Sequence, residues 1–224
     1  MIAKLLLQNL IWIAAMGALL FAPAGTLHWP EAWAFLATIG VLGVACGLWL
    51  AKTDPALLAE RMRPMMQDDQ PAADKKFMLA FGVAGLIWFL AIGLDRRYLV
   101  SSMPSALQGL GWAMLLLSTS FIMWVMRENS FAAPVVKLQA GRGHRVVSSG
   151  PYAFVRHPMY SGTILFFVGT ALLLGSWWGV VLSPMFAVLF AIRSGIEERA
   201  LLAGLPDYAG YAKRVRYRLV PGLW

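Results

Sequence analysis

GTILFFVGTALLLGSWWGVVLSPMFAVLFAI, residues 162–192, contains no charged side chain. The pair Gly175-Ser176 divides this stretch into two apolar runs, Gly162–Leu174 and Trp177–Ile192. Each run is close to the length that a helix needs to cross a hydrocarbon core of about 30 Å. Two tryptophans directly follow the break, and indole side chains prefer the interface between lipid and water. The stretch therefore predicts a tight hairpin of two short membrane helices, or a re-entrant hairpin if the runs do not cross.

Four further apolar runs precede this hairpin, namely Leu5–Ala22, Ala32–Ala51, Phe77–Leu94 and Ala106–Met126. Hydrophobic residues make up 59% of the 224-residue chain and charged residues 13%, whereas about a quarter of a soluble domain is charged. We therefore expect an all-α, polytopic transmembrane bundle of about six helices. Residues 1–104 would supply the N-terminal membrane helices and a connector. Residues 105–224 would form a core with a cytoplasmic cofactor pocket.

The chain carries 19 Lys and Arg residues against 11 Asp and Glu residues. If both termini are cytoplasmic, only Arg96 and Arg97 lie outside, which agrees with the enrichment of basic residues in cytoplasmic loops. We therefore expect a multi-pass protein of the cell inner membrane that contacts membrane lipids and has no nucleic-acid partner. The lone Cys46 and the three histidines lack metal-ligand spacing, so no metal site is expected. The sequence leaves the oligomeric state open.

The densest polar and aromatic cluster, residues 148–162, directly precedes the hairpin. The dipeptides Gly150-Pro151 and His157-Pro158 keep its backbone out of a regular helix, because a residue before proline avoids the α region. Irregular backbone beside a membrane is tolerated where it lines a cavity or meets water. We therefore expect the N–H and C=O groups of this segment to be available to a ligand.

The side chains of this cluster suit an aromatic ligand. The rings of Tyr152, His157 and Tyr160 could flank an adenine, and Arg156 adds a cation. The alternative is an aromatic belt at the membrane interface, with the arginine reaching toward lipid headgroups.

A second polar cluster lies at the end of the last apolar run. Arg193 and Glu197 are four residues apart, so on a helix they share a face and can pair, whereas Glu198 is free for another partner. Ionisable groups at membrane depth indicate a functional site, with a structural ion pair as the alternative. Downstream, residues Leu201–Arg214 predict one amphipathic helix on anionic lipid. The 52–76 loop, with its prolines and mixed charges, is interpreted as a solvated connector.

Five short motifs follow one another in the second half of the chain: Gly150-Pro151-Tyr152, Arg156-His157-Pro158-x-Tyr160-x-Gly162, Glu197-Glu198, Tyr208-x-x-Tyr211 and Arg218-x-x-Pro221. In this order they resemble the signature of the isoprenylcysteine carboxyl methyltransferase family, which is related to the phospholipid N-methyltransferases. The resemblance covers roughly residues 105–224. One departure is Gly204-Leu205-Pro206-Asp207, which stands near the family's usual phenylalanine-glycine and concerns the local loop.

The resemblance implies an enzyme that binds S-adenosylmethionine and transfers its methyl group to a lipophilic acceptor, a small molecule or a lipid. The cofactor would contact Tyr152, Arg156, His157, Pro158, Tyr160 and Glu198. Arg193 and Glu197 would be catalytic, and Arg218 would bind substrate. A carboxylate acceptor needs no strong base, and Arg193 could hold it unless this arginine pairs with Glu197. We therefore expect carboxyl O-methylation of an isoprenylcysteine-like substrate.

Several alternatives remain open from the sequence. A phospholipid amine would have to lose a proton, for which His157 and Glu197 are the available bases. A small thiol is a third acceptor. Steroid and sterol reductases are similar in their C-terminal region, so an NADPH-dependent membrane reductase is another enzyme class. A small transporter or a non-catalytic scaffold is the alternative outside enzymes, although the chain has no evident internal repeat.

Overall fold

The computed structural model describes all 224 residues, and it contains helices, turns and loops but no strand. The apolar helices are α1 (Ile2–Ala24), α2 (Pro30–Thr53), α4 (Ala72–Tyr98), α5 (Ser105–Glu128), α6 (Pro158–Leu173), α7 (Trp177–Leu182) and α8 (Pro184–Gly204). The short helices are α3 (Pro55–Arg61) and α9 (Tyr208–Arg214), with 3₁₀ turns at Ala140–Arg142 and Gly150–Ala153. The expected all-α polytopic bundle is confirmed.

Five stretches are long and apolar enough to cross a membrane: α1, α2, α4, α5 and the stretch Trp177–Gly204, which combines α7 and α8. Helix α6 is also apolar but has 16 residues, fewer than the about 20 of an ordinary crossing. The hairpin around Gly175 is present, because this glycine adopts a φ of +75° that lets the chain reverse. Its second arm extends beyond the expected end, since Pro184 fits the first turn of α8 and the helix continues to Gly204.

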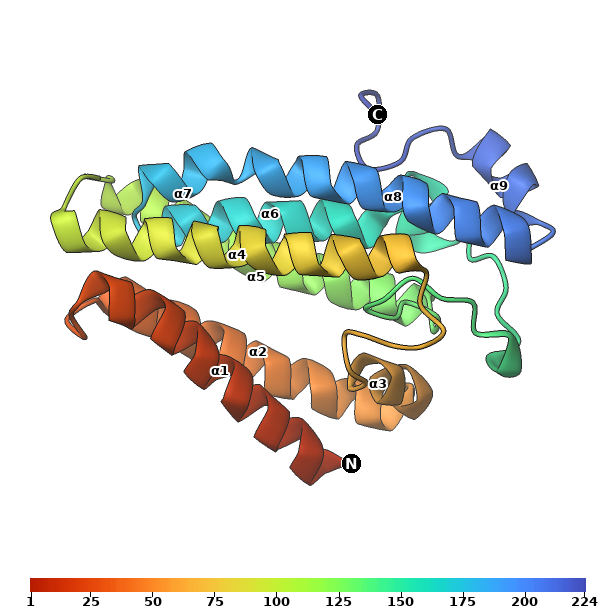
Figure 1. Cartoon of the computed structure of the whole chain (residues 1–224), viewed down its shortest axis with the longest axis horizontal. Coiled ribbons are helices and arrows are strands. Elements are labelled where there is room, and N and C mark those ends of the chain that lie inside the picture. The colour runs from red at the N-terminus through yellow and green to blue at the C-terminus, as the bar shows by residue number, and fades with distance from the viewer.

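The helices lie side by side in one bundle (Figure 1). Helix α1 packs on α2 and α4, α4 packs on α8, and α5 packs on α6. The α5–α6 contact is close, because a Cβ added to Gly169 would lie 2.9 Å from the backbone oxygen of Gly111. Small residues at such crossings let two membrane helices approach through their backbones.

Aromatic side chains join α4, α6 and α8 in the centre of the bundle. The rings of Phe167 and Phe186 stack with centroids 3.6 Å apart, and Trp88 meets both edge-on. The indole N–H of Trp88 donates to the backbone oxygen of Gly179 at 2.8 Å, so its buried polar atom is satisfied. This core fixes α8 against α6, and the ends of these two helices carry the polar motifs.

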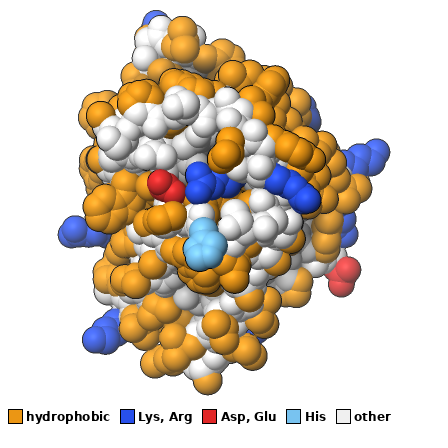
Figure 2. All heavy atoms as spheres, turned by 90° about the vertical axis from the view of Figure 1, so that its left-hand side faces the viewer, with side chains coloured by type: hydrophobic (Ala, Val, Ile, Leu, Met, Phe, Trp, Pro, Cys, Tyr) orange, Lys and Arg blue, Asp and Glu red, His pale blue; other side chains and the backbone are white.

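The two ends of the bundle differ in character. The short connections between α1 and α2, α4 and α5, and α6 and α7 share one end, at the left in Figure 1. Figure 2 views this end and shows a mostly hydrophobic surface with few charged side chains. Helices α3 and α9 and the long segment between α5 and α6 gather at the other end. The polar cluster at residues 148–162 and the one that follows Ile192 therefore converge at this end, as their positions on either side of the hairpin predict.

Two sequence-based expectations are wrong in this region. The helix expected over Leu201–Arg214 is broken, because Leu205 precedes a proline and adopts an extended backbone with φ −124° and ψ 106°. The 52–76 loop is not simply a solvated connector, since it contains α3 and the first turn of α4, where the side chain of Asp74 is fully buried.

Candidate functional site

A cavity opens at the polar end of the bundle, where α6 begins and α8 ends. It holds about 820 Å³ of space between protein atoms, part of it open to solvent. Most of its 22 lining residues are hydrophobic, and they come from the 129–147 segment, α6, α8 and α9. The sequence-predicted residues that line it are Tyr152, Arg156, His157, Tyr160 and Glu197, whereas Pro158, Arg193, Glu198 and Arg218 lie outside its lining.

The segment that leads into α6 is paired with the C-terminal part of the chain. The backbone N–H of Arg156 donates to the oxygen of Tyr217 at 3.0 Å, and that of His157 donates to the oxygen of Arg218 at 2.9 Å. Pro158 begins α6, where a residue without an N–H is tolerated. The N–H groups of Arg156 and His157 are therefore used within the protein and are not available to a ligand.

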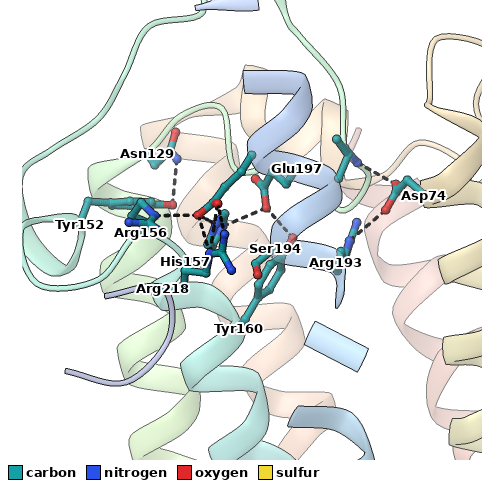
Figure 3. A network of polar contacts seen from close by, with 12 residues as sticks. Asp74, Asn129, Tyr152, Arg156, His157, Tyr160, Arg193, Ser194, Glu197 and Arg218 are labelled. Carbon is teal, nitrogen blue, oxygen red and sulfur yellow. Dashed lines mark hydrogen bonds and ion pairs between the residues drawn. The ribbon is translucent and has the colours of Figure 1, made fainter. Parts of the chain in front are cut away.

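Glu198 is the centre of an ion cluster that holds the same two segments together, and Figure 3 labels its partners Arg156, His157 and Arg218. Its Oε1 accepts from Nε of Arg156 at 2.6 Å and faces Nε2 of His157 at 3.2 Å. Its Oε2 accepts from the guanidinium of Arg218 at 2.9 Å and 3.1 Å. Three cationic partners occupy this carboxylate, which is largely buried. Glu198 thus acts first as an anchor for the C-terminal segment.

Glu197 lies one residue earlier on α8 and lines the cavity. Its Oε2 accepts from the hydroxyl of Tyr160 at 2.6 Å and from Nδ1 of His157 at 3.1 Å. Its Oε1 has no hydrogen-bond partner in the protein, and its side chain retains 31% of its exposure. One oxygen of this carboxylate is therefore positioned by the protein, and the other is free for a ligand.

His157 lies between the two glutamates, with one ring nitrogen toward each. Burial would lower the pKa of this histidine, but Glu197 and Glu198 raise it above its ordinary value of 6.5. The ring also stacks on Tyr160, with centroids 5.4 Å apart. Because both nitrogens face carboxylate oxygens, the arrangement favours a protonated imidazolium that donates on both sides.

Arg193 does not pair with Glu197, although the sequence spacing allowed that ion pair. Its Nε donates to Oδ1 of Asp74 at 3.0 Å, and a second guanidinium nitrogen donates to the backbone oxygen of Pro134. The guanidinium also lies over the ring of Phe77, 4.9 Å from its centroid. The packing of α4 on α8 places the buried carboxylate of Asp74 within hydrogen-bond distance of Arg193. Arg193 therefore pairs with Asp74 and not with Glu197 on its own helix.

The connector between α2 and α4 and the first turn of α4 also hold the segment that lines the cavity. Oδ2 of Asp74 accepts from the backbone N–H of Val136 at 2.9 Å. The guanidinium of Arg61 donates to the oxygen of Ala132 at 2.9 Å, and Lys137 forms a buried ion pair with Glu60. One wall of the cavity is thus fixed by residues from the first half of the chain.

Three tyrosines form another part of the wall. The hydroxyl of Tyr152 accepts from the side-chain amide of Asn129 at 2.8 Å, and the hydroxyl of Tyr211 donates to the backbone oxygen of Tyr152 at 2.8 Å. The hydroxyl of Tyr208 is buried and has no partner. Burial raises the pKa of all three phenols, so each stays protonated at neutral pH.

Sequence reasoning did not assign four residues that the structure places at or behind the cavity: Asp74, Asn129, Arg145 and Tyr208. Arg145 is exposed at the cavity and has no carboxylate partner. The spacing Tyr208-x-x-Tyr211 was the only available signal, because it belongs to the ordered motifs. No signal in the sequence pointed to Asp74, because its partners Val136 and Arg193 are far away along the chain.

Parts of the chain are similar to known proteins. Residues 107–205 match the phospholipid methyltransferase family. A protein-S-isoprenylcysteine O-methyltransferase of Schizosaccharomyces pombe is 35% identical over 83 residues, which are 36% of this chain and 35% of the relative. The cobalt-zinc-cadmium resistance protein CzcN of Cupriavidus metallidurans is 32% identical over 74 residues, which are 33% of this chain and 34% of the relative. The matches thus span about a third of each relative's length.

Proposed function

We propose that this multi-pass membrane protein is an S-adenosylmethionine-dependent methyltransferase. The match of residues 107–205 to the phospholipid methyltransferase family and the similarity to a protein-S-isoprenylcysteine O-methyltransferase support the proposal. We propose further that it methylates the carboxylate of an isoprenylcysteine-like acceptor. The observation that carries the proposal is the cavity lined mostly by the matched region, including Tyr152, Tyr160 and Glu197.

The residues of the cavity fit this cofactor. S-adenosylmethionine carries an ammonium, a carboxylate, a sulfonium and an adenine. The free Oε1 of Glu197 suits the ammonium, and the unpartnered hydroxyl of Tyr208 offers a donor. Apolar and aromatic side chains supply most of the remaining lining, which suits a flat ring and a lipophilic acceptor.

When bound, the cofactor supplies an electrophilic methyl group, and its S–CH₃ bond breaks as the acceptor oxygen forms an O–CH₃ bond. The protein therefore needs to align two ligands and exclude water rather than provide a nucleophile. Tyr160 and His157 hold Glu197 in place through hydrogen bonds to its Oε2. Arg193 acts through Asp74 on the cavity wall, and Arg156 and Arg218 act through Glu198 on the C-terminal segment.

The state of His157 supports a carboxylate over an amine as acceptor. An amine must lose its proton before methylation, and a histidine that already donates to two glutamates is not available as a base. A carboxylate needs no such step. Arg145, a cation without a carboxylate partner at the cavity, could hold it.

We also propose that the cavity end of the bundle faces the cytoplasm of the cell inner membrane. All Lys and Arg residues except Arg96 and Arg97 belong to the segments assigned to this side, and basic residues are enriched in cytoplasmic loops. Cysteine substitutions at Arg97 and Lys213, labelled from outside with an impermeant maleimide, test the orientation. Only the Arg97 variant should react, and labelling of the Lys213 variant alone would reverse the assignment.

Calorimetric titration of the detergent-purified protein with S-adenosylmethionine, S-adenosylhomocysteine and NADPH tests the cofactor. Saturable binding of the first two, with a higher melting temperature, is expected, because a ligand of the native state stabilises it. Binding of NADPH alone would indicate a reductase instead. Incubation with the cofactor and a prenylated cysteine, a phosphatidylethanolamine or an alkyl thiol, followed by mass spectrometry, tests the acceptor. Methylation of the amine or the thiol alone would contradict the carboxylate assignment.

A further inference from the structure

Helix α9 carries two tyrosines whose hydroxyls differ in hydrogen bonding. Both Tyr208 and Tyr211 are almost fully buried and line the cavity. The hydroxyl of Tyr211 donates to the backbone oxygen of Tyr152 at 2.8 Å, whereas the hydroxyl of Tyr208 has no partner. Nearly all buried polar groups in native proteins are hydrogen-bonded, and an unpaired one destabilises the fold. The Tyr208 hydroxyl therefore has no hydrogen-bond partner within the protein. The cavity that Tyr208 lines has room for a ligand that would supply one.

The backbone fixes Tyr208 in this position. Its N–H donates to the oxygen of Leu205 at 3.0 Å, so the turn that ends α8 also sets the start of α9. Its ring packs against Tyr211, with centroids 5.7 Å apart, and Tyr211 is itself anchored. The side chain is 4% exposed and cannot turn its hydroxyl to bulk water without leaving this cluster.

The surroundings of Tyr208 define what its hydroxyl would bind. Leu205, Tyr208, Tyr211 and Val215 form an apolar cluster, with Val146 and Leu201 packed beside it. Burial, followed by the charges of Glu198 and Glu197, raises the pKa of the phenol, so the group remains a donor. The same two glutamates would repel an anion at this place. A flat, uncharged ring with an acceptor atom at its edge fits an apolar wall with one donor.

We propose that α9 forms the wall for the purine ring of the bound cofactor, and that the Tyr208 hydroxyl donates a hydrogen bond to one of its ring nitrogens. The inference rests on the proposed function, because it takes S-adenosylmethionine and its demethylated product as the ligands. It assigns recognition of the base to a helix that lies outside the matched residues 107–205. No covalent step is involved.

The variants Tyr208→Phe and Tyr211→Phe form a matched pair, because both remove one hydroxyl from the same helix. Without ligand, Tyr211→Phe should lower the melting temperature, since it leaves the oxygen of Tyr152 unpaired. Tyr208→Phe should not lower it, since it removes a hydroxyl that has no partner. A fall in Tyr208→Phe as large as that in Tyr211→Phe would overturn the proposal, because the hydroxyl would then have a partner in the protein.

Calorimetric titration of the full chain with S-adenosylhomocysteine gives the second readout. Tyr208→Phe should raise the Kd about 2- to 13-fold, the range of one ordinary hydrogen bond. An unchanged Kd would overturn the inference alone, because the wild-type protein would still bind. Absence of binding by the wild-type protein would overturn the proposed cofactor and this inference with it.

Analogues of S-adenosylhomocysteine in which CH replaces one ring nitrogen, at position 1, 3 or 7, identify the acceptor atom. For the analogue that lacks the accepting nitrogen, the wild-type protein and Tyr208→Phe should bind equally well, as in a double-mutant cycle. If the difference between the two proteins persists with all three analogues, the acceptor is not a ring nitrogen of the purine and the assignment of α9 is overturned.

Discussion

Glu197 and Glu198 are the same residue type at adjacent positions, yet their environments give them different functions. Glu198 is surrounded by Arg156, His157 and Arg218, whereas one oxygen of Glu197 faces the cavity. The sequence interpretation placed Glu198 at the cofactor and gave Glu197 a catalytic role, with an ion pair to Arg193 as the alternative. Adjacent helix positions point about 100° apart, but which direction meets the cavity depends on the packing of α8.

Glu197→Gln is expected to weaken binding of S-adenosylmethionine. The variant keeps an oxygen for Tyr160 but removes the charge that would meet the cofactor's ammonium. A charge-assisted hydrogen bond contributes about 1.5–3 kcal/mol, so the Kd should rise by about 10- to 150-fold. Calorimetric titration measures this change, with Glu128→Gln outside the cavity lining as a control. Equal Kd values for the variant and the wild-type protein would contradict the role given to Glu197.

Glu198→Gln is expected to act on the fold. It leaves Arg156 and Arg218 without their carboxylate in a largely buried cluster. Loss of hydrogen bonds to charged groups should lower the free energy of unfolding by about 1.5–3 kcal/mol. Thermal unfolding without ligand measures this change, and Glu197→Gln should lower the free energy of unfolding by less than Glu198→Gln. A larger loss in Glu197→Gln would reverse the assignment of the two glutamates.

His157 is expected to make stability depend on pH. Its pKa is raised by Glu197 and Glu198, although burial opposes the shift, so the folded state binds the proton more tightly than the unfolded chain. The resulting stabilisation is fully present below the unfolded pKa of about 6.5 and is lost as pH rises through the raised pKa. The difference in melting temperature between the wild-type protein and His157→Gln should therefore shrink from pH 5 to alkaline pH. A difference that grows with pH would contradict this view.

At the scale of elements, the first turn of α4 holds part of the cavity wall. Asp74 binds Arg193 on α8 and the backbone N–H of Val136 on the wall. Asp74→Asn should lower the melting temperature and raise the Kd for S-adenosylhomocysteine, because it leaves a buried guanidinium without its countercharge. Asp68→Asn is the matched control, since Asp68 is exposed on the connector before α4. Similar effects of both substitutions would show that Asp74 has no special role.

Local sequence rules explain the ends of several elements. Gly175 reverses the chain between α6 and α7 through its positive φ, and Pro158 begins α6. Pro206 ends α8 by forcing Leu205 out of the α region. This proline is visible in the sequence, but the apparent amphipathic pattern of residues 201–214 favoured one continuous helix. The start and end of these elements follow from such local signals, whereas the partners of their side chains do not.

The whole molecule depends on contacts between its two halves. The ion pairs Arg193–Asp74 and Lys137–Glu60 and the aromatic contact of Phe77 with Phe190 all join residues before and after position 104. Residues 105–224 expressed alone should therefore not bind S-adenosylhomocysteine, and co-expression with residues 1–104 should restore binding. Calorimetry on both preparations measures this. Wild-type affinity of the C-terminal half alone would mean that the first helices are not needed for the site.

The sequence by itself determined the membrane class, the helical architecture, the hairpin and the convergence of the polar motifs at one end. These properties follow from composition, run length and turn residues, all of which act locally along the chain. Only the tertiary structure decided that Arg193 binds Asp74, that Glu197 lines the cavity and that Glu198 anchors the C-terminal segment. A buried charge takes the partner that packing brings within about 3 Å, and residues 119 positions apart give no local signal of that approach.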